Sequence, residues 1–215
     1  GLITALLHPW AESPGRVKSH TVSAKFESKP KNVKITAMKD KNNIQVIRAP
    51  DNRLRVKTKR VNKVTPELIR ITEEMVKLTK TFKDPEGVGL ASTQIGRDEK
   101  LFVAKNGKDF SVFINPKIVT SSKKTKIFFE GCLSIPNYYG EIERPISVTV
   151  SYEDEKGVVQ TKKLTGLLAW VFQHEVDHLE GTLFVDRVLN QKGRMFKVVG
   201  KDRSGGEVFE EVTPW

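Results

Sequence analysis

The sequence contains a single cysteine, Cys132, among its 215 residues. A disulfide bond within the chain is therefore excluded, which suits a reducing compartment such as the cytosol or an organelle matrix. A lone thiol is more often a small apolar core residue than a ligand or a nucleophile. Cys132 gains a chemical role only if other residues in the sequence provide one.

The chain also lacks a long hydrophobic run. Apolar residues make up 38% of it, but the longest candidate, residues 166–172, is far shorter than the roughly 20 residues that a membrane helix needs. The apolar residues 1–7 have no basic flank before them and no clear cleavage site after them, so we expect no secretory signal there. These absences favour one ordinary domain with a tail.

Acidic residues are scarce in the first third of the chain. Residues 1–64 carry 15 Lys and Arg against 4 Asp and Glu, whereas residues 65–215 carry 22 of each, so the net charge of +11 comes from the first part. A basic arm can contact RNA phosphates, although a solvated, disordered extension is the plainer interpretation. We interpret residues 1–40 as a basic N-terminal extension, either disordered or not native to the protein, and residues 41–215 as the folded domain.

Strand-like and helix-like segments fall into separate groups along the folded domain. Short β-rich segments bounded by turn residues predict strands at residues 44–47, 101–104, 111–114, 126–129, 146–152, 158–164 and 206–212. A helix is predicted to begin at Thr65-Pro66, and a second helix to run from about Thr165 to Glu180. Because the first half of this second helix is apolar on all sides, we expect it to be central and buried. The grouping predicts an α+β fold with largely antiparallel sheets packed around that helix.

The second predicted helix carries the segment His174-Glu175-Val176-Asp177-His178, which holds two of the four histidines. Histidines four positions apart lie on the same helix face, so both imidazoles can reach one metal ion. Glu175 can then reach a water beside the metal and act as a general base. Two ordinary surface histidines are the plainer alternative, which the predicted burial of the helix disfavours.

A catalytic metal usually has three protein ligands and one open position, so a third ligand must be found. No histidine follows His178. An endopeptidase of the zincin type would use a downstream group, and the formal candidates are Glu180, Glu207, Glu210 and Glu211. Upstream, Cys132 offers a thiolate, which binds iron or zinc well.

A glycine-rich segment at residues 87–96 holds a further candidate, Gln94. The segment is not a good nucleotide-binding loop, because Ser92 stands where the third glycine of G-x-G-x-x-G belongs. The Gln94 amide is a donor of the kind that stabilises an oxygen gaining charge during attack on a carbonyl. A solvated glutamine in a flexible loop is the plainer interpretation.

Together these three segments resemble the peptide deformylases. That family carries G-x-G-L-A-A-x-Q, E-G-C-L-S and Q-H-E-x-D-H in this order, and the matching segments here are residues 87–94, 130–134 and 173–178. The resemblance spans about residues 44–190. The departures are Ser92-Thr93 in place of Ala-Pro, Asn137 where glycine is common, and a bulky Trp170.

The resemblance implies a metal-dependent hydrolase that removes the N-formyl group from the initiator methionine of new polypeptides and releases formate. It implies Cys132, His174 and His178 as metal ligands and Glu175 as the acid/base. Gln94 and the Leu133 backbone N–H would stabilise the oxyanion. The cofactor would be one divalent metal ion. Fe²⁺ is the usual metal of the family, and Zn²⁺, Ni²⁺ or Co²⁺ can replace it.

The resemblance also implies a pocket for the methionine side chain. The residues expected to bind the substrate are Gly87, Val88, Gly89, Leu167, Trp170 and Val171. For Val88, Leu167, Trp170 and Val171 plain core packing is the alternative, and for Trp170 the two interpretations are equally supported. Asp177 is expected to support the helix or a histidine.

The expected partners are N-formylmethionyl nascent peptides, with a transient ribosome contact through the basic N-terminal region and no membrane. A monomer in the bacterial cytoplasm is expected, with an organelle matrix as the alternative because organelles also begin synthesis with formylmethionine. A basic RNA- or ribosome-binding protein with a decayed enzyme site is the rival from another class. Every metal and acid/base position is filled, which disfavours decay.

Overall fold

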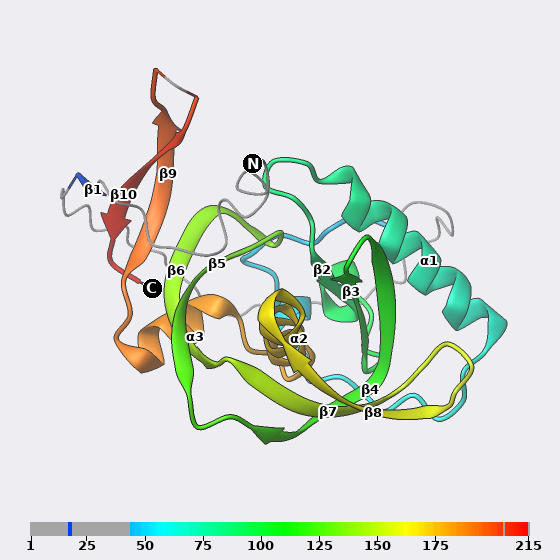
Figure 1. Ribbon diagram of the computed structural model, residues 1–215. Coiled ribbons are helices and arrows are strands. Elements are labelled where there is room, and N and C mark those ends of the chain that lie inside the picture. The colour runs from blue at the N-terminus through cyan, green and yellow to red at the C-terminus, as the bar shows by residue number, and fades with distance from the viewer. Residues whose placement is uncertain (1–16, 19–43, 204, 215) are drawn as a thin grey trace.

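The computed structural model describes residues 17–18, 44–203 and 205–214. Its strands form two five-stranded sheets (Figure 1). The first sheet has the order β1-β10-β9-β6-β5, with β1 Val17–Lys18, β10 Glu207–Val212, β9 Met195–Lys201, β6 Ile135–Pro145 and β5 Thr125–Cys132. The second has the order β2-β3-β4-β7-β8, with β2 Gly89–Ala91, β3 Leu101–Asn106, β4 Asp109–Ser121, β7 Ser147–Glu153 and β8 Val159–Thr165. All the strand pairs are antiparallel except β1 with β10, so the predicted α+β class with largely antiparallel sheets is confirmed.

Helix α2, Gly166–Leu179, lies at the centre of the molecule (Figure 1). Its Phe172 ring packs edge-on against Phe102 and Phe113 in the second sheet. On the other side, Trp170 stacks on Phe128 of β5 in the first sheet. The helix therefore fills the space between the sheets, as its continuous apolar first half predicts.

Helix α1, Pro66–Thr81, covers the second sheet from outside and follows the predicted pattern. The Thr65 side chain accepts a hydrogen bond from the Leu68 backbone N–H at 3.2 Å, which satisfies one of the free donors at the helix start. Leu68 and Met75 are buried in the core beneath it. The remaining helices are α3, Phe184–Gln191, and two 3₁₀ turns at Asn52–Arg55 and Ser92–Ile95.

The strand predicted at residues 44–47 is wrong. This segment is extended but belongs to no strand, and the Ile47 backbone N–H donates to the Gln94 carbonyl at 2.7 Å. Ile44 and Val46 are apolar because they pack against the core cluster under α1, not because they pair in a sheet. The Thr165 side chain likewise makes no capping hydrogen bond, although Thr165 is the residue before α2.

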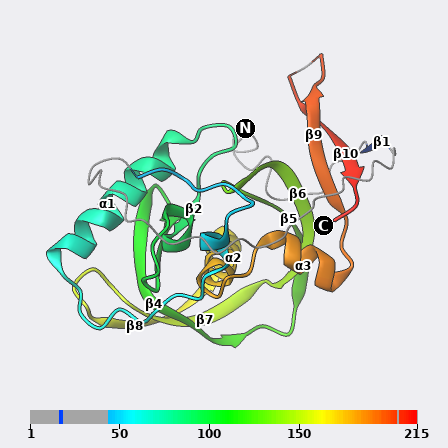
Figure 2. The same ribbon diagram turned by 180° about the vertical axis from the view of Figure 1, so that it is seen from behind.

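The strands β9 and β10, at one end of the first sheet, project away from the rest of the molecule in both views (Figure 2). β1 lies within the predicted N-terminal extension and pairs with β10, with Val17 opposite Phe209. The other residues of that extension lie outside the described part of the chain. Within the described part, no helix is long and apolar enough to cross a membrane.

Candidate metal centre

The three predicted metal ligands come from two elements that meet at the centre of the fold. Cys132 is the last residue of β5, and His174 and His178 lie one turn apart on α2. One ligand atom from each lies within 4.8 Å of the others. The Cys132 Sγ is 3.2 Å from His178 Nε2, and the two imidazole centroids are 5.0 Å apart. The fold thus brings the trio within reach of a single metal ion.

The downstream glutamates proposed as alternatives lie elsewhere. Glu180 forms ion pairs with Lys57 and Lys100. Glu207, Glu210 and Glu211 lie on β10 in the projecting hairpin. Of these candidates, Cys132 is the one that lies beside the two histidines.

The chemistry of these residues fits a divalent first-row metal. A thiolate and two imidazoles form a donor set that such ions accept, and three ligands leave one position for water or substrate. Among the described residues, two buried side-chain atoms have no hydrogen-bond partner, Glu175 Oε2 and His178 Nδ1. Buried polar atoms are normally paired. Both exceptions belong to the His174–His178 segment, which indicates a site built for a bound group.

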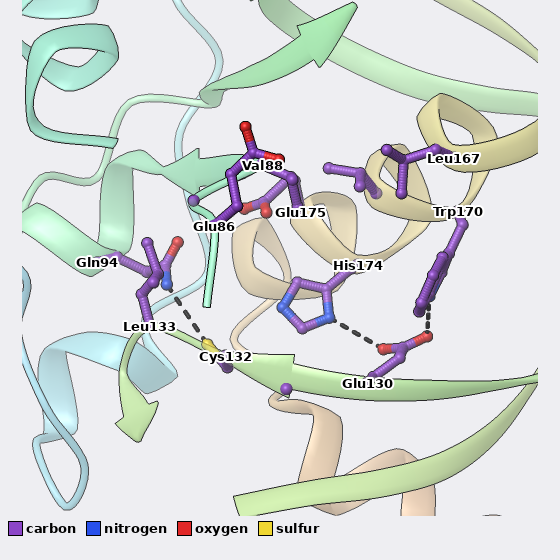
Figure 3. A pocket seen from close by; sticks show the side chains of 14 residues that line it. Glu86, Val88, Gln94, Glu130, Cys132, Leu133, Leu167, Trp170, His174 and Glu175 are labelled. Atoms are coloured by element: carbon purple, nitrogen blue, oxygen red, sulfur yellow. Dashed lines mark hydrogen bonds and ion pairs between the residues drawn. The ribbon is translucent and has the colours of Figure 1, made fainter. Parts of the chain in front are cut away.

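Glu130 holds His174 in place (Figure 3). Its carboxylate lies 3.0 Å from His174 Nδ1, accepts from the Trp170 indole N–H at 2.6 Å and forms a two-pronged pair with Arg144. Burial by itself would raise the pKa of Glu130. The Arg144 charge and the hydrogen bonds from Arg144 and His174 lower it by more, so the pKa falls to about 2. An ionised Glu130 accepts a hydrogen bond from the Nδ1–H group of His174, which leaves Nε2 to face Cys132 and His178.

Asp177 supports α2 through arginines. It accepts hydrogen bonds from Arg144 Nη1 and Arg187 Nε, both at 3.0 Å. Arg144 therefore joins the carboxylates of Glu130 and Asp177 inside the protein, and Arg187 ties α3 to the same group. The expectation that Asp177 supports the helix agrees with these contacts.

The Gln94 side chain is 2% exposed, so the solvated interpretation is wrong. Its Oε1 accepts from the Ala91 backbone N–H at 2.8 Å, and its Nε2 donates to Ser134 Oγ at 3.1 Å. The same Nε2 is 3.4 Å from Cys132 Sγ. The amide is therefore fixed with its N–H group facing the ligand cluster.

The Glu175 carboxylate lies against the backbone of β2. A Cβ atom added to Gly89 would be 2.2 Å from Glu175 Oε1 and 2.8 Å from Val171 Cγ1, so only glycine leaves room for the acid. Glu175 is 3% exposed, and burial raises its pKa to about 7. Position 89 is therefore a glycine because a larger side chain would collide with the Glu175 carboxylate.

A pocket opens beside the ligand cluster (Figure 3). The six residues predicted to bind substrate all line it: Gly87, Val88, Gly89, Leu167, Trp170 and Val171. It is also lined by Cys132, His174, Glu175, Gln94 and Leu133, whereas His178 does not line it and is 1% exposed. Three lining residues, Glu86, Glu130 and Gly131, were not assigned from the sequence. Glu130 belongs to the matched E-G-C-L-S segment, but its partners come from β6 and α2, and spacing alone cannot reveal them.

Comparison with known proteins identifies the family of this chain. The polypeptide deformylase family model matches residues 44–194. The chain belongs to the polypeptide deformylase family. Members of this family are hydrolases that remove the N-formyl group from nascent peptides, so the chain is an enzyme.

Deformylases from several bacteria illustrate the likeness. The peptide deformylase of Mesorhizobium japonicum is 40% identical over 168 residues, which cover 74% of this chain and 94% of that protein. The peptide deformylase of Rhizobium meliloti is 46% identical over 123 residues, covering 55% of this chain and 71% of that protein. The solved structure of the Synechococcus elongatus enzyme has a TM-score of 0.64 at 39% identity and covers 73% of this chain and 86% of that one.

Proposed function

We propose that this deformylase hydrolyses the formyl amide of the N-terminal formylmethionine of newly made polypeptides in a metal-dependent reaction. The products are formate and a polypeptide with a free α-amino group. The observation that carries the proposal is the meeting of Cys132, His174 and His178 beside a pocket that also exposes Glu175 and Gln94.

Cys132, His174 and His178 would hold one divalent metal ion. When bound, the metal supplies Lewis-acid chemistry, making water more acidic and polarising a carbonyl. We propose Fe²⁺ as the native ion, with Zn²⁺, Ni²⁺ or Co²⁺ as replacements. The donor set of one thiolate and two imidazoles accepts each of them.

Glu175 moves the proton. Its carboxylate takes a proton from the water as the water oxygen bonds to the formyl carbon, and it returns that proton to the nitrogen as the C–N bond breaks. The carboxylate ends each cycle as it began. Its unpaired Oε2 and its position at the pocket support this role.

Gln94 and Leu133 stabilise the oxygen that gains negative charge. The Gln94 amide is held by Ala91 and Ser134 with its N–H group toward the cluster, so it needs little rearrangement to donate to that oxygen. The Leu133 backbone N–H, next to Cys132 at the pocket, is the second donor. Fixed donors of this kind stabilise the transition state more than the substrate.

The methionine side chain occupies the apolar part of the pocket. Val88, Leu167, Trp170 and Val171 line this part, and Gly87 and Gly89 let the substrate backbone approach β2. Thioether sulfur makes favourable contacts with aromatic rings, which suits the Trp170 indole.

Formate release from formyl-Met-Ala-Ser tests the proposal. We expect release by the purified protein, loss of activity after treatment with a chelator, and recovery when Fe²⁺ or Co²⁺ is added back. Acetyl-Met-Ala-Ser, in which a methyl group replaces the formyl hydrogen, is the matched control and should react far more slowly. Chelator-resistant formate release would contradict metal dependence.

The same assay separates the zincin endopeptidase. A zincin would cleave an internal bond of a longer unformylated peptide and would not need Cys132. We expect no internal cleavage, and Cys132→Ala should remove both metal binding and formate release.

The partners are formylated nascent peptides, and we propose a monomer that contacts the ribosome transiently through the basic N-terminal region. That region lies almost entirely outside the described residues. For location we propose the bacterial cytoplasm, supported by bacterial relatives, with an organelle matrix as the alternative.

A further inference from the structure

Trp170 connects two parts of the site that the proposed reaction uses separately. Its ring lines the pocket, and its indole Nε1 donates to Glu130 Oε1 at 2.6 Å. Glu130 in turn contacts the Nδ1 atom of His174 (Figure 3). One side chain therefore touches both the space for substrate and the carboxylate behind a metal ligand.

The Glu130 carboxylate is fully engaged. Oε1 accepts from Trp170 and Arg144 Nε, and Oε2 accepts from Arg144 Nη2 and pairs with His174. A carboxylate offers about four acceptor positions, so these contacts use all of them. Because Glu130 is 1% exposed, water cannot easily replace a lost donor.

The indole holds the carboxylate from a direction that Arg144 does not. Terminal torsions of glutamate are broad, so the carboxylate plane is set by its partners and not by its own rotamer. Arg144 approaches from β6, whereas Trp170 approaches from α2, the helix that carries His174. Trp170 lies one helical turn before His174, so the two side chains meet the same carboxylate from one helix face.

The position of the indole is itself well determined. Trp170 is 5% exposed and stacks on Phe128 with a centroid distance of 4.3 Å and an interplanar angle of 24°. Stacking fixes the ring plane and so the direction of the N–H bond. A side chain that fills the pocket would press on this same ring.

We propose that Trp170 is a positioning residue for the metal centre: through Glu130 it holds the His174 ring toward Cys132 and His178, while its indole forms a wall of the substrate pocket. The proposal rests on the proposed metal site. If the proposal holds, the Trp170 side chain affects both how the pocket is filled and how the His174 ring is oriented. In this proposal Trp170 acts on the metal centre through its hydrogen bond to Glu130.

Trp170→Phe tests the proposal because it keeps an aromatic ring against Phe128 and removes the N–H donor. The full-length proteins compete for Zn²⁺ with a chromophoric chelator, and the Co²⁺-loaded forms are compared by their visible absorption. We expect Trp170→Phe to weaken Zn²⁺ binding about threefold to tenfold, less than the roughly 10- to 100-fold typical of a direct partner of a ligand. The Co²⁺ absorption should shift, which loss of stability alone would not cause.

Leu167→Ala is the matched control. Leu167 also lines the pocket, but it has no polar group to offer Glu130. We expect its KM for formyl-Met-Ala-Ser to rise while its Zn²⁺ affinity and Co²⁺ absorption stay as in the unaltered protein.

A double-variant cycle shows whether the effect passes through Glu130. Adding Trp170→Phe to Glu130→Gln should cost little further Zn²⁺ affinity, since coupled residues are not additive. If Trp170→Phe is too unstable to purify, Trp170→Tyr also lacks the indole N–H and carries the same expectation.

The inference is overturned if Trp170→Phe binds Zn²⁺ as tightly as the unaltered protein with the same Co²⁺ absorption, even if its KM changes. Trp170 would then be a pocket wall alone. If the unaltered protein binds no metal, the proposed function itself fails, and the inference fails with it. The first result leaves the metal-dependent activity intact, so the two failures are distinct.

Discussion

Glu175 is a buried carboxyl group whose Oε2 has no hydrogen-bond partner in the described part of the chain, an arrangement that favours proton transfer over structural support. We predict that Glu175→Gln lowers kcat/KM for formyl-Met-Ala-Ser by about 10²- to 10⁴-fold, the usual contribution of a general acid/base. Because glutamine has nearly the same shape, the metal content measured by atomic absorption should not change. A Glu175→Gln protein with normal activity would remove Glu175 from the mechanism.

Gln94 presents a different group to the same pocket. We predict that Gln94→Ala lowers kcat by about 10²- to 10³-fold, as loss of one oxyanion donor typically does. KM should change much less, because the donor acts mainly in the transition state. Steady-state kinetics at matched metal content check this split. A change confined to KM would assign Gln94 to substrate binding instead.

Gly89 makes room for Glu175, and a methyl group there tests the close packing of β2 against α2. We predict that Gly89→Ala lowers kcat/KM by about 10²-fold, since an added Cβ at 2.2 Å from Oε1 displaces the carboxylate by about an ångström. Gly200→Ala is the matched control: nothing lies within 4 Å of its added Cβ, and activity should be unchanged. Equal activity of the two variants would contradict the proposed position of Glu175.

The elements around the site are joined by a buried charge network. Arg144 on β6 contacts Glu130 on β5 and Asp177 on α2, and Asp177 contacts Arg187 on α3. We predict that Arg144→Met lowers the free energy of unfolding by about 3–5 kcal/mol, because it leaves buried carboxylates without their cation. Urea unfolding measures this.

Arg60→Met is the control for that prediction. Arg60 pairs with Glu153 at the surface, and its side chain is 68% exposed. Its removal should cost less than about 1 kcal/mol, as is usual for exposed pairs. Similar losses for Arg60 and Arg144 would show that the buried network is not important for stability.

The elements that the sequence predicts well are those whose burial pattern is regular. α1 and α2 follow helical spacing, and turn-forming residues at Asn106-Gly107 and at positions 155–157 separate paired strands. β6 escapes prediction because Pro136, Asn137 and Gly140 interrupt its sequence. Asn137 stands where glycine is common in the family and adopts φ 67°, a conformation that asparagine tolerates better than most residues.

Helix α3 escapes prediction for another reason, whereas the strand predicted at residues 206–212 is present as β10. α3 has eight residues and ends at Gln191, before Lys192 with φ 55°, so it offers little more than two turns of pattern. The opposite error at residues 44–47 arises because an apolar segment can pack on a core without joining a sheet. The local composition of a segment indicates whether it is buried. Whether it pairs with another strand depends on the rest of the chain.

Across the whole molecule, the site is assembled from segments that lie far apart in the sequence. The ligand types and the His174–His178 spacing are visible from the sequence, because i,i+4 spacing on a helix fixes their relative position. The role of Glu130 is not visible, because it depends on β5, β6 and α2 meeting. Glu130 is held by two donor residues, Arg144 and Trp170, which come from different elements. Packing between elements, unlike spacing within one, has no local signal.

The stability of the whole molecule should depend on the metal. A metal that binds only the folded chain stabilises it by about 2.7 kcal/mol when its free concentration is 100 times Kd. We predict that Tm rises when Zn²⁺ is added to chelator-treated protein and that Cys132→Ala abolishes this rise.

The chelator-treated proteins separate metal binding from packing. Without metal, Cys132→Ala should unfold close to the unaltered protein, because the change removes one small side chain at the end of β5. Calorimetry without Zn²⁺ measures the effect of the substitution on packing, and calorimetry with Zn²⁺ measures the stabilisation by the metal. A rise in Tm that persists in Cys132→Ala would mean that the ion binds without the thiol, as the zincin alternative requires. Equal Tm values with and without Zn²⁺ in the unaltered protein would mean that the cluster does not bind this metal to the folded state at all.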